Sequence, residues 1–275
     1  MKIDSHIHFW KYDKAKDGWI TNDMKILKQD YLPENISLSF RNNDIDGCVA
    51  VQVRQTELET HFLVELAKTH SIIKGVVGWI DLQNENIHER LRYFSQYPMI
   101  KGWRHIVQGE SNDFLLREDF QRGIAALGSY NYTYDILIYH HQLKPALELI
   151  SKFPEQKFVI DHCAKPGIAN KKIDEWKSLM QEMAEHPNIY CKLSGLFTEA
   201  KWKEWSAGDF YPYLDVVFDA FGTDRLMFGS DWPVILLSGI YVQWKSLLDK
   251  YMENFDSEEK EKVFGENAIR FYNLN

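Results

Sequence analysis

Two histidines near the start of the chain, His6 and His8, are the first residues whose spacing suggests chemistry. They lie in a short apolar run, and side chains two apart on a strand point to the same face of a sheet. Two imidazoles on one face can chelate a metal ion. The alternative is a pair of histidines that are only hydrogen-bonded within the fold, and the pair alone does not decide between the two.

Two later motifs carry residues of the same kinds. Asp161 and His162 end the sixth apolar run of the chain, and GSDWP at 229–233 ends the eighth. In a barrel of parallel strands the C-terminal ends of all strands meet at one face, so His162 and Asp231 would join the N-terminal pair there. Three imidazoles and a carboxylate suit a zinc-like cation with a position open for water. Taken singly, Asp231 could cap the following loop and His162 could be a buried, hydrogen-bonded ring.

The elements that must position these residues appear as eight short apolar, β-branched or aromatic runs, most of them followed by a helix-like segment. The predicted strands are Ile3–His8, Cys48–Val53, Gly75–Leu82, Ile100–Val107, Tyr132–Tyr139, Lys157–His162, Ile189–Gly195 and Arg225–Asp231. The predicted helices between them are His61–His70, Ile87–Tyr97, Leu116–Gly128, Gln142–Phe153, Ile173–Glu185 and Pro212–Phe221. Strands that alternate with helices form βαβ units and a parallel sheet.

Eight such units predict an α/β fold closed into a (β/α)8 TIM barrel of the metal-dependent hydrolase type. A doubly wound open sheet would more often show a Gly-rich phosphate-binding turn after its first strand, and this chain has none. The segment Glu258–Tyr272 predicts a last helix with one apolar face, which we expect to dock on the barrel wall. No linker or break in composition divides the chain, so residues 1–275 are assigned to one domain.

The composition limits the partners and the compartment. The chain carries 32 Lys and Arg against 40 Asp and Glu, a formal charge of −8 that offers no positive field to nucleic acid. No run approaches the ~20 apolar residues of a membrane span, and no signal peptide follows Met1. Cys48, Cys163 and Cys191 lack CxxC spacing and indicate buried thiols in a reducing compartment. We expect a cytoplasmic protein that acts on a small molecule. A homo-oligomer is possible, and the sequence does not decide the oligomeric state.

Five motifs in order along the chain resemble those of the amidohydrolase superfamily, in particular its amidohydrolase-2 branch. They are IDSHIHFW, KGWRHIVQGE, FVIDHCAKP, NIYCKLSGLFTEA and RLMFGSDWP. Within that branch the chain is most similar to sugar-acid lactonases of the L-fuconolactonase and L-rhamnonolactonase type, and more distantly to pyrone-dicarboxylate and sulfomuconolactone lactonases. The resemblance implies a hydrolase of carbohydrate metabolism that opens the ester bond of a small lactone.

The resemblance also implies the metal and catalytic residues, which by motif are His6, His8, His162 and Asp231. Binuclear members of the superfamily add a bridging carboxylated Lys or a Glu on strand four and a His on strand five. Here the corresponding strands read WRH and YDI. That departure predicts one divalent metal ion, expected to be zinc, which similar lactonases bind weakly or do without.

Opening a lactone requires a water nucleophile, a group that takes its proton, and positive charge near the carbonyl oxygen. Asp231 is the predicted general base, and it would return the proton to the ring oxygen. Arg104 is predicted to bind the substrate, since a guanidinium can bind hydroxyls or a carboxylate; an ion pair on the barrel rim is the alternative. The other predicted substrate-binding residues are His105, Gln52, Asp135 and Trp232, with Lys192, Arg54, Trp10 and Trp103 as weaker candidates.

Two other functions stay open on the sequence. Non-oxidative decarboxylases share the branch, the barrel and the ligand set, although they resemble this chain less in KGWRHIVQGE and CKLSGLFTEA. A ligand-binding barrel without catalysis is the second alternative, but such a barrel has no need of a base like Asp231. Lactone hydrolysis is therefore the primary prediction.

Overall fold

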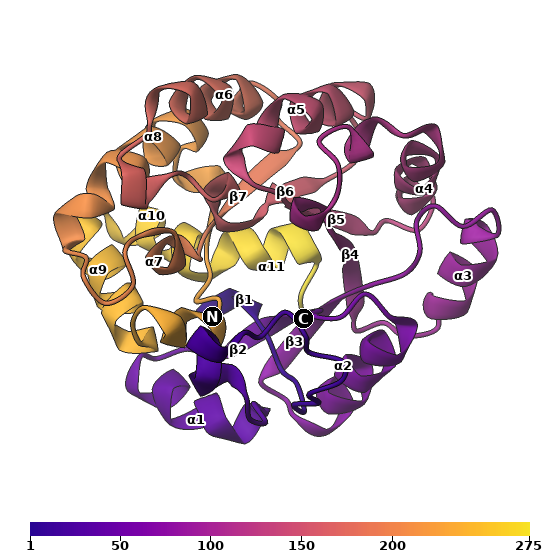
Figure 1. Cartoon of the computed structure of the whole chain (residues 1–275), viewed down its shortest axis with the longest axis horizontal. Coiled ribbons are helices and arrows are strands. Elements are labelled where there is room, and N and C mark those ends of the chain that lie inside the picture. Colours follow the sequence, from indigo (N-terminus) through magenta and orange to yellow (C-terminus); the bar gives the residue numbers. More distant parts are fainter.

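Eight parallel strands form the inner wall of the molecule (Figure 1). The computed structural model describes residues 1–275. Each strand pairs with the next one along the chain, and both faces of the sheet are covered, which is why the strands read as near-continuous apolar runs. Their bounds are β1 Ile3–Ile7, β2 Gly47–Val51, β3 Ile73–Gly78, β4 Ile100–Ile106, β5 Thr133–Leu137, β6 Phe158–Ile160, β7 Ile189–Leu193 and β8 Leu226–Phe228.

The sheet closes between its first and last strands. Ile7 forms a parallel bridge with Trp232, and the backbone N–H of His8 donates to the Trp232 carbonyl at 2.7 Å. The N–H of Asp231 donates to the carbonyl of His6 at 2.9 Å. These bonds close the predicted (β/α)8 barrel and hold the segment after β8 against the N-terminal histidines.

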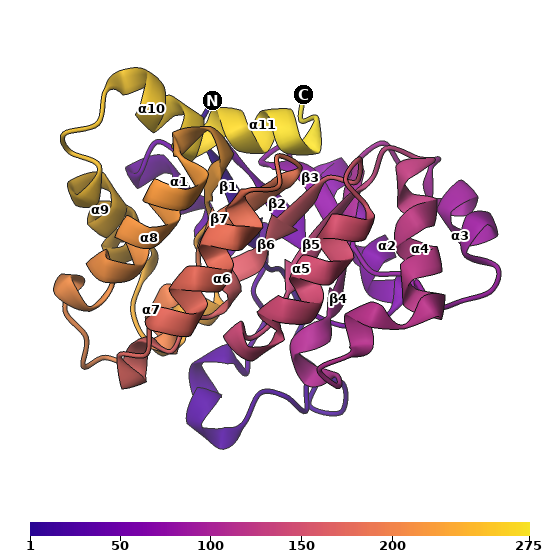
Figure 2. The same cartoon turned by 90° about the horizontal axis from the view of Figure 1, so that it is seen from above.

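Helices surround the barrel, as Figures 1 and 2 show. Their bounds are α1 Pro33–Asn42, α2 Glu57–Thr69, α3 Ile87–Phe94, α4 Glu118–Gly128, α5 Leu143–Lys152, α6 Asp174–Ala184, α7 Leu196–Glu199, α8 Tyr211–Phe221, α9 Tyr241–Tyr251, α10 Ser257–Glu261 and α11 Asn267–Tyr272. All six helices predicted between strands are present, with ends that differ by about one turn. None of the helices is both long and apolar enough to span a bilayer.

Three helices, α1, α7 and α9, are not predicted by the sequence pattern. In α1 only Pro33, Ile36 and Phe40 are buried along ten residues, so its apolar stripe is thin. The four residues of α7 are too few to show a helical period. In α9 the buried face includes a charged residue, Lys245, which interrupts the apolar pattern.

All eight strands end earlier than the sequence predicts, and at two of them the difference places site residues in turns. β6 ends at Ile160 and β8 at Phe228, so His162 and Asp231 lie in the turns beyond those strands. The reason lies in the backbone, because His162 has φ 55° and Asp231 has φ 57°, in the left-handed region that a strand does not contain. Both side chains therefore approach the barrel mouth from turns, which can aim them more freely than a strand.

The C-terminal helix closes the opposite end of the barrel, where both chain termini also lie (Figure 2). In α11, Ala268, Phe271 and Tyr272 pack against apolar side chains that line the lower barrel interior. Those side chains are Ile3, Val49, Val51, Val77, Val159 and Met227. The expectation that the segment Glu258–Tyr272 docks on the barrel wall is confirmed for its first part, where Phe264 packs on Phe228 of β8. It is wrong for α11, whose apolar face covers the end of the barrel.

Candidate active site

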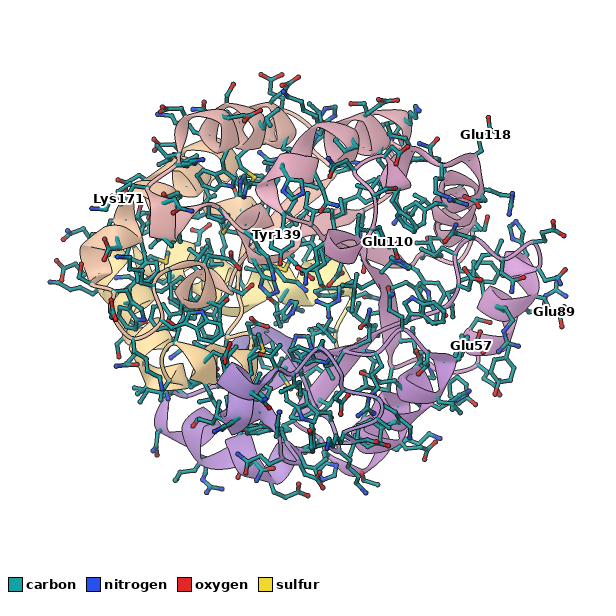
Figure 3. The ribbon with its side chains drawn as sticks, in the orientation of Figure 1. Glu57, Glu89, Glu110, Glu118, Tyr139 and Lys171 are labelled. Carbon is teal, nitrogen blue, oxygen red and sulfur yellow. The ribbon has the colours of Figure 1, made fainter.

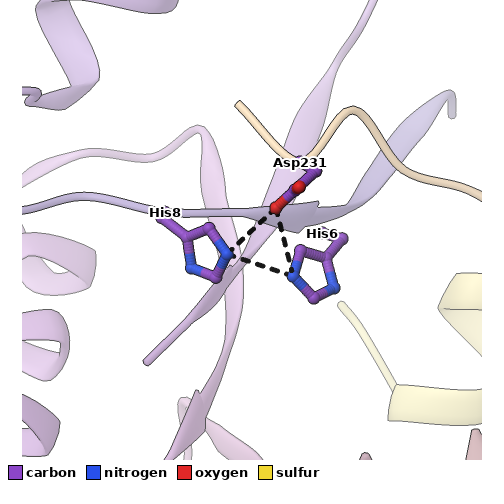
Figure 4. A group of neighbouring side chains, drawn as sticks. All are labelled: His6, His8 and Asp231. Atoms are coloured by element: carbon purple, nitrogen blue, oxygen red, sulfur yellow. Dashed lines mark hydrogen bonds and ion pairs between the residues drawn. The ribbon is translucent and has the colours of Figure 1, made fainter. Parts of the chain in front are cut away.

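His6, His8 and Asp231 meet at the mouth of the barrel (Figure 4). Nε2 of His8 lies 3.2 Å from Oδ1 of Asp231 and 3.2 Å from Nε2 of His6. Nε2 of His6 lies 3.8 Å from the same Asp231 oxygen. The end of β1 and the turn after β8 thus bring together three atoms that can bind a cation or a proton.

His8 is held by a second contact on the other side of its ring. Its Nδ1 lies 2.8 Å from the carbonyl oxygen of Val51, the last residue of β2. Because a carbonyl only accepts hydrogen bonds, Nδ1 carries the proton and Nε2 keeps its lone pair toward Asp231. A contact of this type fixes both the tautomer and the orientation of a ligand histidine.

His162 reaches the same point from an unusual turn. Four consecutive residues, 162–165, have φ between 48° and 56°, and this left-handed turn carries the ring to the mouth. Nδ1 of His162 lies 2.8 Å from the hydroxyl oxygen of Ser194, and its Nε2 lies 3.9 Å from Oδ1 of Asp231. The ring therefore points its Nε2 at the carboxylate that His6 and His8 also face.

Asp161 lies under His6 and joins it to two buried cations. Its Oδ1 lies 3.2 Å from Nδ1 of His6 and 3.0 Å from Nζ of Lys192, and its Oδ2 accepts from Nη1 of Arg104 at 3.0 Å. Lys192 also pairs with Asp135 at 2.5 Å. Two cations balance two carboxylates in this layer, so the buried charges compensate one another.

Burial sets the charge of the imidazoles. Desolvation lowers the pKa of both His6 and His162 well below the usual value, despite the nearby carboxylates. For Asp231, burial acts to raise the pKa, but contacts with His162 and His8 outweigh it and leave the pKa below its usual value. At neutral pH the site therefore combines unprotonated rings of His6 and His162 with the ionised carboxylate of Asp231.

A pocket of about 230 Å³ opens beside these residues. Its polar side is lined by His8, His162, Asp231, Arg104, Lys165 and Gln108, and its apolar side by Trp19, Val53, Ile106, Leu137 and Val234. Drug-sized ligands occupy sites of ~300–1,000 Å³, so this volume suits a smaller molecule with one polar and one apolar face.

Comparison with known proteins identifies the family. A family model for amidohydrolases matches residues 3–274. The chain belongs to the amidohydrolase family. The amidohydrolase is 37% identical over 286 residues to an L-fucono-1,5-lactonase of Burkholderia multivorans, which covers 100% of this chain and 96% of the relative. It is 31% identical over 279 residues to an L-fucono-1,5-lactonase of Burkholderia ambifaria, with the same coverage.

A crystal structure has nearly the same backbone as this amidohydrolase. It is that of an amidohydrolase from Burkholderia multivorans with bound zinc, and it matches with a TM-score of 0.96 at 37% identity. The match covers 100% of both chains. The barrel and its connecting loops are therefore shared along the whole length.

The donor set of this amidohydrolase fits one divalent cation. One ligand atom each from His6, His8 and Asp231 lie within 4.8 Å of one another, and mixed imidazole and carboxylate donors suit zinc. The two Nε2 atoms lie 3.2 Å apart, and facing lone pairs at that distance repel unless a proton or a cation lies between them. Either a hydrogen bond from Nε2 of His6 to Nε2 of His8 or a cation bound by both nitrogens satisfies this distance.

A second group of potential ligands does not fit a metal ion. His6, Asp161 and His162 also lie within 4.8 Å of one another. Both oxygens of Asp161 are already ion-paired, Oδ1 with Lys192 and Oδ2 with Arg104. A further divalent ion would meet two fixed cations there, so the arrangement provides for one ion.

Of the predicted substrate-binding residues, only Arg104 lines the pocket. Gln52 is fully buried and donates its amide to the Arg104 carbonyl at 3.0 Å. Asp135 is fully buried below the mouth, where it pairs with Lys192. Gln52 and Asp135 therefore support the site from beneath and do not face the pocket.

His105 and Trp232 lie away from the pocket for different reasons. His105 follows Arg104 on β4, so it points to the other face of the strand, where it stacks on Phe114 at 4.7 Å between ring centroids. Trp232 is 4% exposed and packs edge-on against Tyr31. Neither contributes to the pocket lining, which corrects the expectation that they bind substrate.

The weaker candidates are also engaged elsewhere. Trp103 is fully buried against Phe94, and Trp10 packs on Tyr31, so both belong to the core outside the barrel. Arg54 donates to both oxygens of Asp17 at 2.7 Å and lies outside the pocket. These corrections share one cause, because proximity to a motif in sequence does not fix which way a side chain points.

Sequence reasoning missed seven of the 11 pocket residues, among them Trp19 and Lys165. Lys165 stands within the FVIDHCAKP motif, three residues after His162, so its place in a motif was the available signal. Trp19 belongs to the long loop between β1 and α1, where no period marks an orientation.

Proposed function

We propose that this amidohydrolase hydrolyses the lactone of a small sugar acid, of the L-fucono- or L-rhamnonolactone kind, to the open-chain acid. The curated relatives that match the whole chain at 37% and 31% identity are L-fucono-1,5-lactonases. The single observation that carries the proposal is Asp231, an ionised carboxylate that lines a small pocket between His8 and His162. A base beside space for water and substrate is what ester hydrolysis requires.

The reaction follows from the side chains that meet at the mouth. Asp231 accepts a proton from a water molecule while the water oxygen attacks the lactone carbonyl carbon. The tetrahedral intermediate then expels the ring oxygen, to which Asp231 returns the proton. Positioned proton transfer of this type contributes ~10²–10⁴ in rate. The imidazoles of His6, His8 and His162 orient the water.

One divalent ion, expected to be zinc, would be held by His6, His8, His162 and Asp231. When bound, such an ion supplies a more acidic water at neutral pH. The proposal is supported by the donor set at the mouth and by zinc in the crystal structure of the related amidohydrolase. The metal ion need not bind tightly for the reaction to proceed, because the histidines also orient water by hydrogen bonds.

The metabolic role and the cellular compartment of the reaction are part of the same proposal. We place it in carbohydrate metabolism, because the substrate is a sugar-acid lactone. Cys48, Cys163 and Cys191 are buried free thiols, which favours the cytoplasm as a reducing compartment.

A panel of aldonolactones tests the proposal. The L-fucono, L-rhamnono, D-arabinono and D-galactono forms are incubated with the protein, and acid release is followed with a pH indicator. We expect saturable hydrolysis of at least one lactone. Release of CO2 from a carboxylated arene, with no lactone hydrolysed, would favour the decarboxylase alternative, and ligand binding without turnover would favour a non-catalytic barrel.

A further inference from the structure

Two of the three side-chain cations near the pocket already pair with buried groups of the protein. Arg104 is 3% exposed, and its Nη1 donates to Asp161 at 3.0 Å while its Nη2 donates to the carbonyl of Gln52. Lys192 is fully buried and pairs with Asp135 and Asp161 at 2.5 and 3.0 Å. Neither can turn to a substrate without leaving a buried carboxylate or carbonyl unpaired.

Lys165 is the third cation, and its ammonium makes no hydrogen bond with the protein. Its nearest carboxylate oxygen is Oε1 of Glu199 at 3.9 Å, beyond hydrogen-bond distance. The Lys165 side chain is 16% exposed and lines the pocket together with His8, His162 and Asp231. The three N–H donors of Lys165 therefore lack a partner in the protein, whereas among the neighbouring cations only Nε of Arg104 lacks one.

The backbone holds Lys165 in this position at a cost. It is the fourth of the left-handed residues after β6, a conformation that costs roughly 1–2 kcal/mol per residue for L-amino acids. Its N–H donates to the carbonyl of His162 at 2.8 Å, and its own carbonyl lies 3.0 Å from Nδ1 of His140. Strain of this kind is kept where the surrounding structure fixes a functional group.

Two neighbouring side chains, Tyr139 and Glu199, surround the ammonium of Lys165. Its Nζ lies 5.4 Å from the ring centroid of Tyr139. Figure 3 shows Tyr139 near the centre of the barrel, far from peripheral residues such as Glu89 and Glu118. Glu199 is mostly buried beside the ammonium and supplies a counter-charge.

We propose that Lys165 is a further catalytic residue of this site, which binds the lactone carbonyl oxygen through its ammonium and then holds the carboxylate of the product. The proposal rests on the function proposed above. As water attacks the carbonyl carbon, the carbonyl electron pair moves to oxygen, and Lys165 hydrogen-bonds that oxyanion without giving up a proton. The proton of the water passes to Asp231 and then to the ring oxygen as the ring bond breaks.

The first test compares Lys165→Met with Lys172→Met, an exposed lysine of the same loop that does not line the pocket. Loss of one oxyanion donor typically lowers kcat by ~10²–10³, so we expect a fall of that size for Lys165→Met and none for Lys172→Met. Zinc content and melting temperature should equal those of the wild type. Lys165→Gln, which keeps a neutral donor, serves as a second variant and should lie between them.

The second test measures binding by calorimetry, without turnover. The aldonate anion of the best substrate should bind Lys165→Met at least tenfold more weakly than wild type, whereas the corresponding neutral alditol should bind both equally. If both Lys165 variants keep wild-type kcat/KM and aldonate affinity, the proposal is overturned. Equal losses of activity, zinc and melting temperature in both variants would also overturn it, because they would indicate a structural role.

Failure of the proposed function would look different. A wild type that hydrolyses no lactone but binds the aldonate through Lys165 would refute lactone hydrolysis and support the carboxylate site. A wild type that neither hydrolyses the lactones nor binds the aldonate would overturn both proposals.

Discussion

The absent side chain of Gly195 leaves the space that the imidazole of His162 occupies. A Cβ at Gly195 would lie 2.5 Å from both Cγ and Nδ1 of the ring, well inside van der Waals contact. The same glycine has φ +65°, so its backbone also disfavours any other residue. Gly195 and His162 come from successive strand ends, after β7 and β6, and their fit sets the ring against Ser194.

Gly195→Ala should therefore displace His162 and impair hydrolysis. We expect at least a tenfold loss of kcat/KM, together with a loss of stability of about 1 kcal/mol or more from the left-handed backbone. Gly222→Ala is the matched control, because Gly222 has φ +62° but no atom within 4 Å of its Cβ position. The control should lose stability and keep its kcat/KM, and equal kinetics for the two variants would contradict this account.

The ion pairs beneath the site should matter for folding. Lys192→Met leaves Asp135 without a cation and Asp161 with Arg104 alone, and removing one partner of a buried pair costs about 3–5 kcal/mol. Tyr272→Phe removes only the 2.8 Å hydrogen bond that its hydroxyl donates to Asp135, worth about 1 kcal/mol. Urea unfolding measures both values. Similar losses of unfolding free energy for the two variants would show that the buried ion pairs contribute less to stability than this account assigns to them.

The strand–helix rhythm was sufficient to predict the barrel and the meeting of its N-terminal histidines with Asp231. Side chains alternate along a strand, so the adjacent residues Arg104 and His105 cannot both face the barrel interior. With Arg104 facing inward, His105 should not have been predicted to bind the substrate. The roles of Asp135 and Lys192 were not readable, because a charged residue on a strand looks the same whether it faces a ligand or a buried partner. Such pairs form only when distant strands come together.

The turns after β6 and β8 were beyond sequence reasoning for another reason. Asp and His are among the non-glycine residues that adopt a left-handed backbone most often, but even they do so rarely, so the residue types of His162 and Asp231 do not predict it. The position of α11 was likewise predicted wrongly, since an apolar face on a helix fits a barrel wall and a barrel end equally well. Only the residues on the other side of the contact decide between them.

Stability should depend on pH through Glu59, a buried residue of α2. Burial raises its pKa to about 7, although its carboxylate accepts hydrogen bonds from the N–H groups of Val53 and Arg54. Because the pKa is raised in the folded state, this contribution is full below pH ~4.5 and is lost as the pH rises through about 7. The shift corresponds to roughly 3 kcal/mol.

Glu59→Gln, which is neutral at every pH, isolates that effect. Unfolding free energies of the wild type and the variant are compared at pH 4.5 and pH 8. We expect the wild type to lose roughly 3 kcal/mol relative to the variant over that interval. Parallel pH profiles for the two proteins would refute the assignment to Glu59.

Metal analysis should find at most one ion per chain. Protein purified without chelator and dialysed against zinc should hold up to one equivalent, because Lys192 and Arg104 already occupy the oxygens of Asp161. Removing the ion with a chelator should lower the melting temperature, and readdition should restore it. Two equivalents of zinc would contradict the mononuclear site.

The most direct measurement is the turnover of Asp231→Asn on the best lactone of the panel, with acid release as the readout and zinc content determined in parallel. Asparagine keeps the size of the side chain but cannot accept the proton of water. We predict a fall in kcat of ~10²–10⁴ with modest change in the affinity for the aldonate product. Turnover by Asp231→Asn within a factor of two of the wild type would contradict the central claim that this carboxylate drives the hydrolysis.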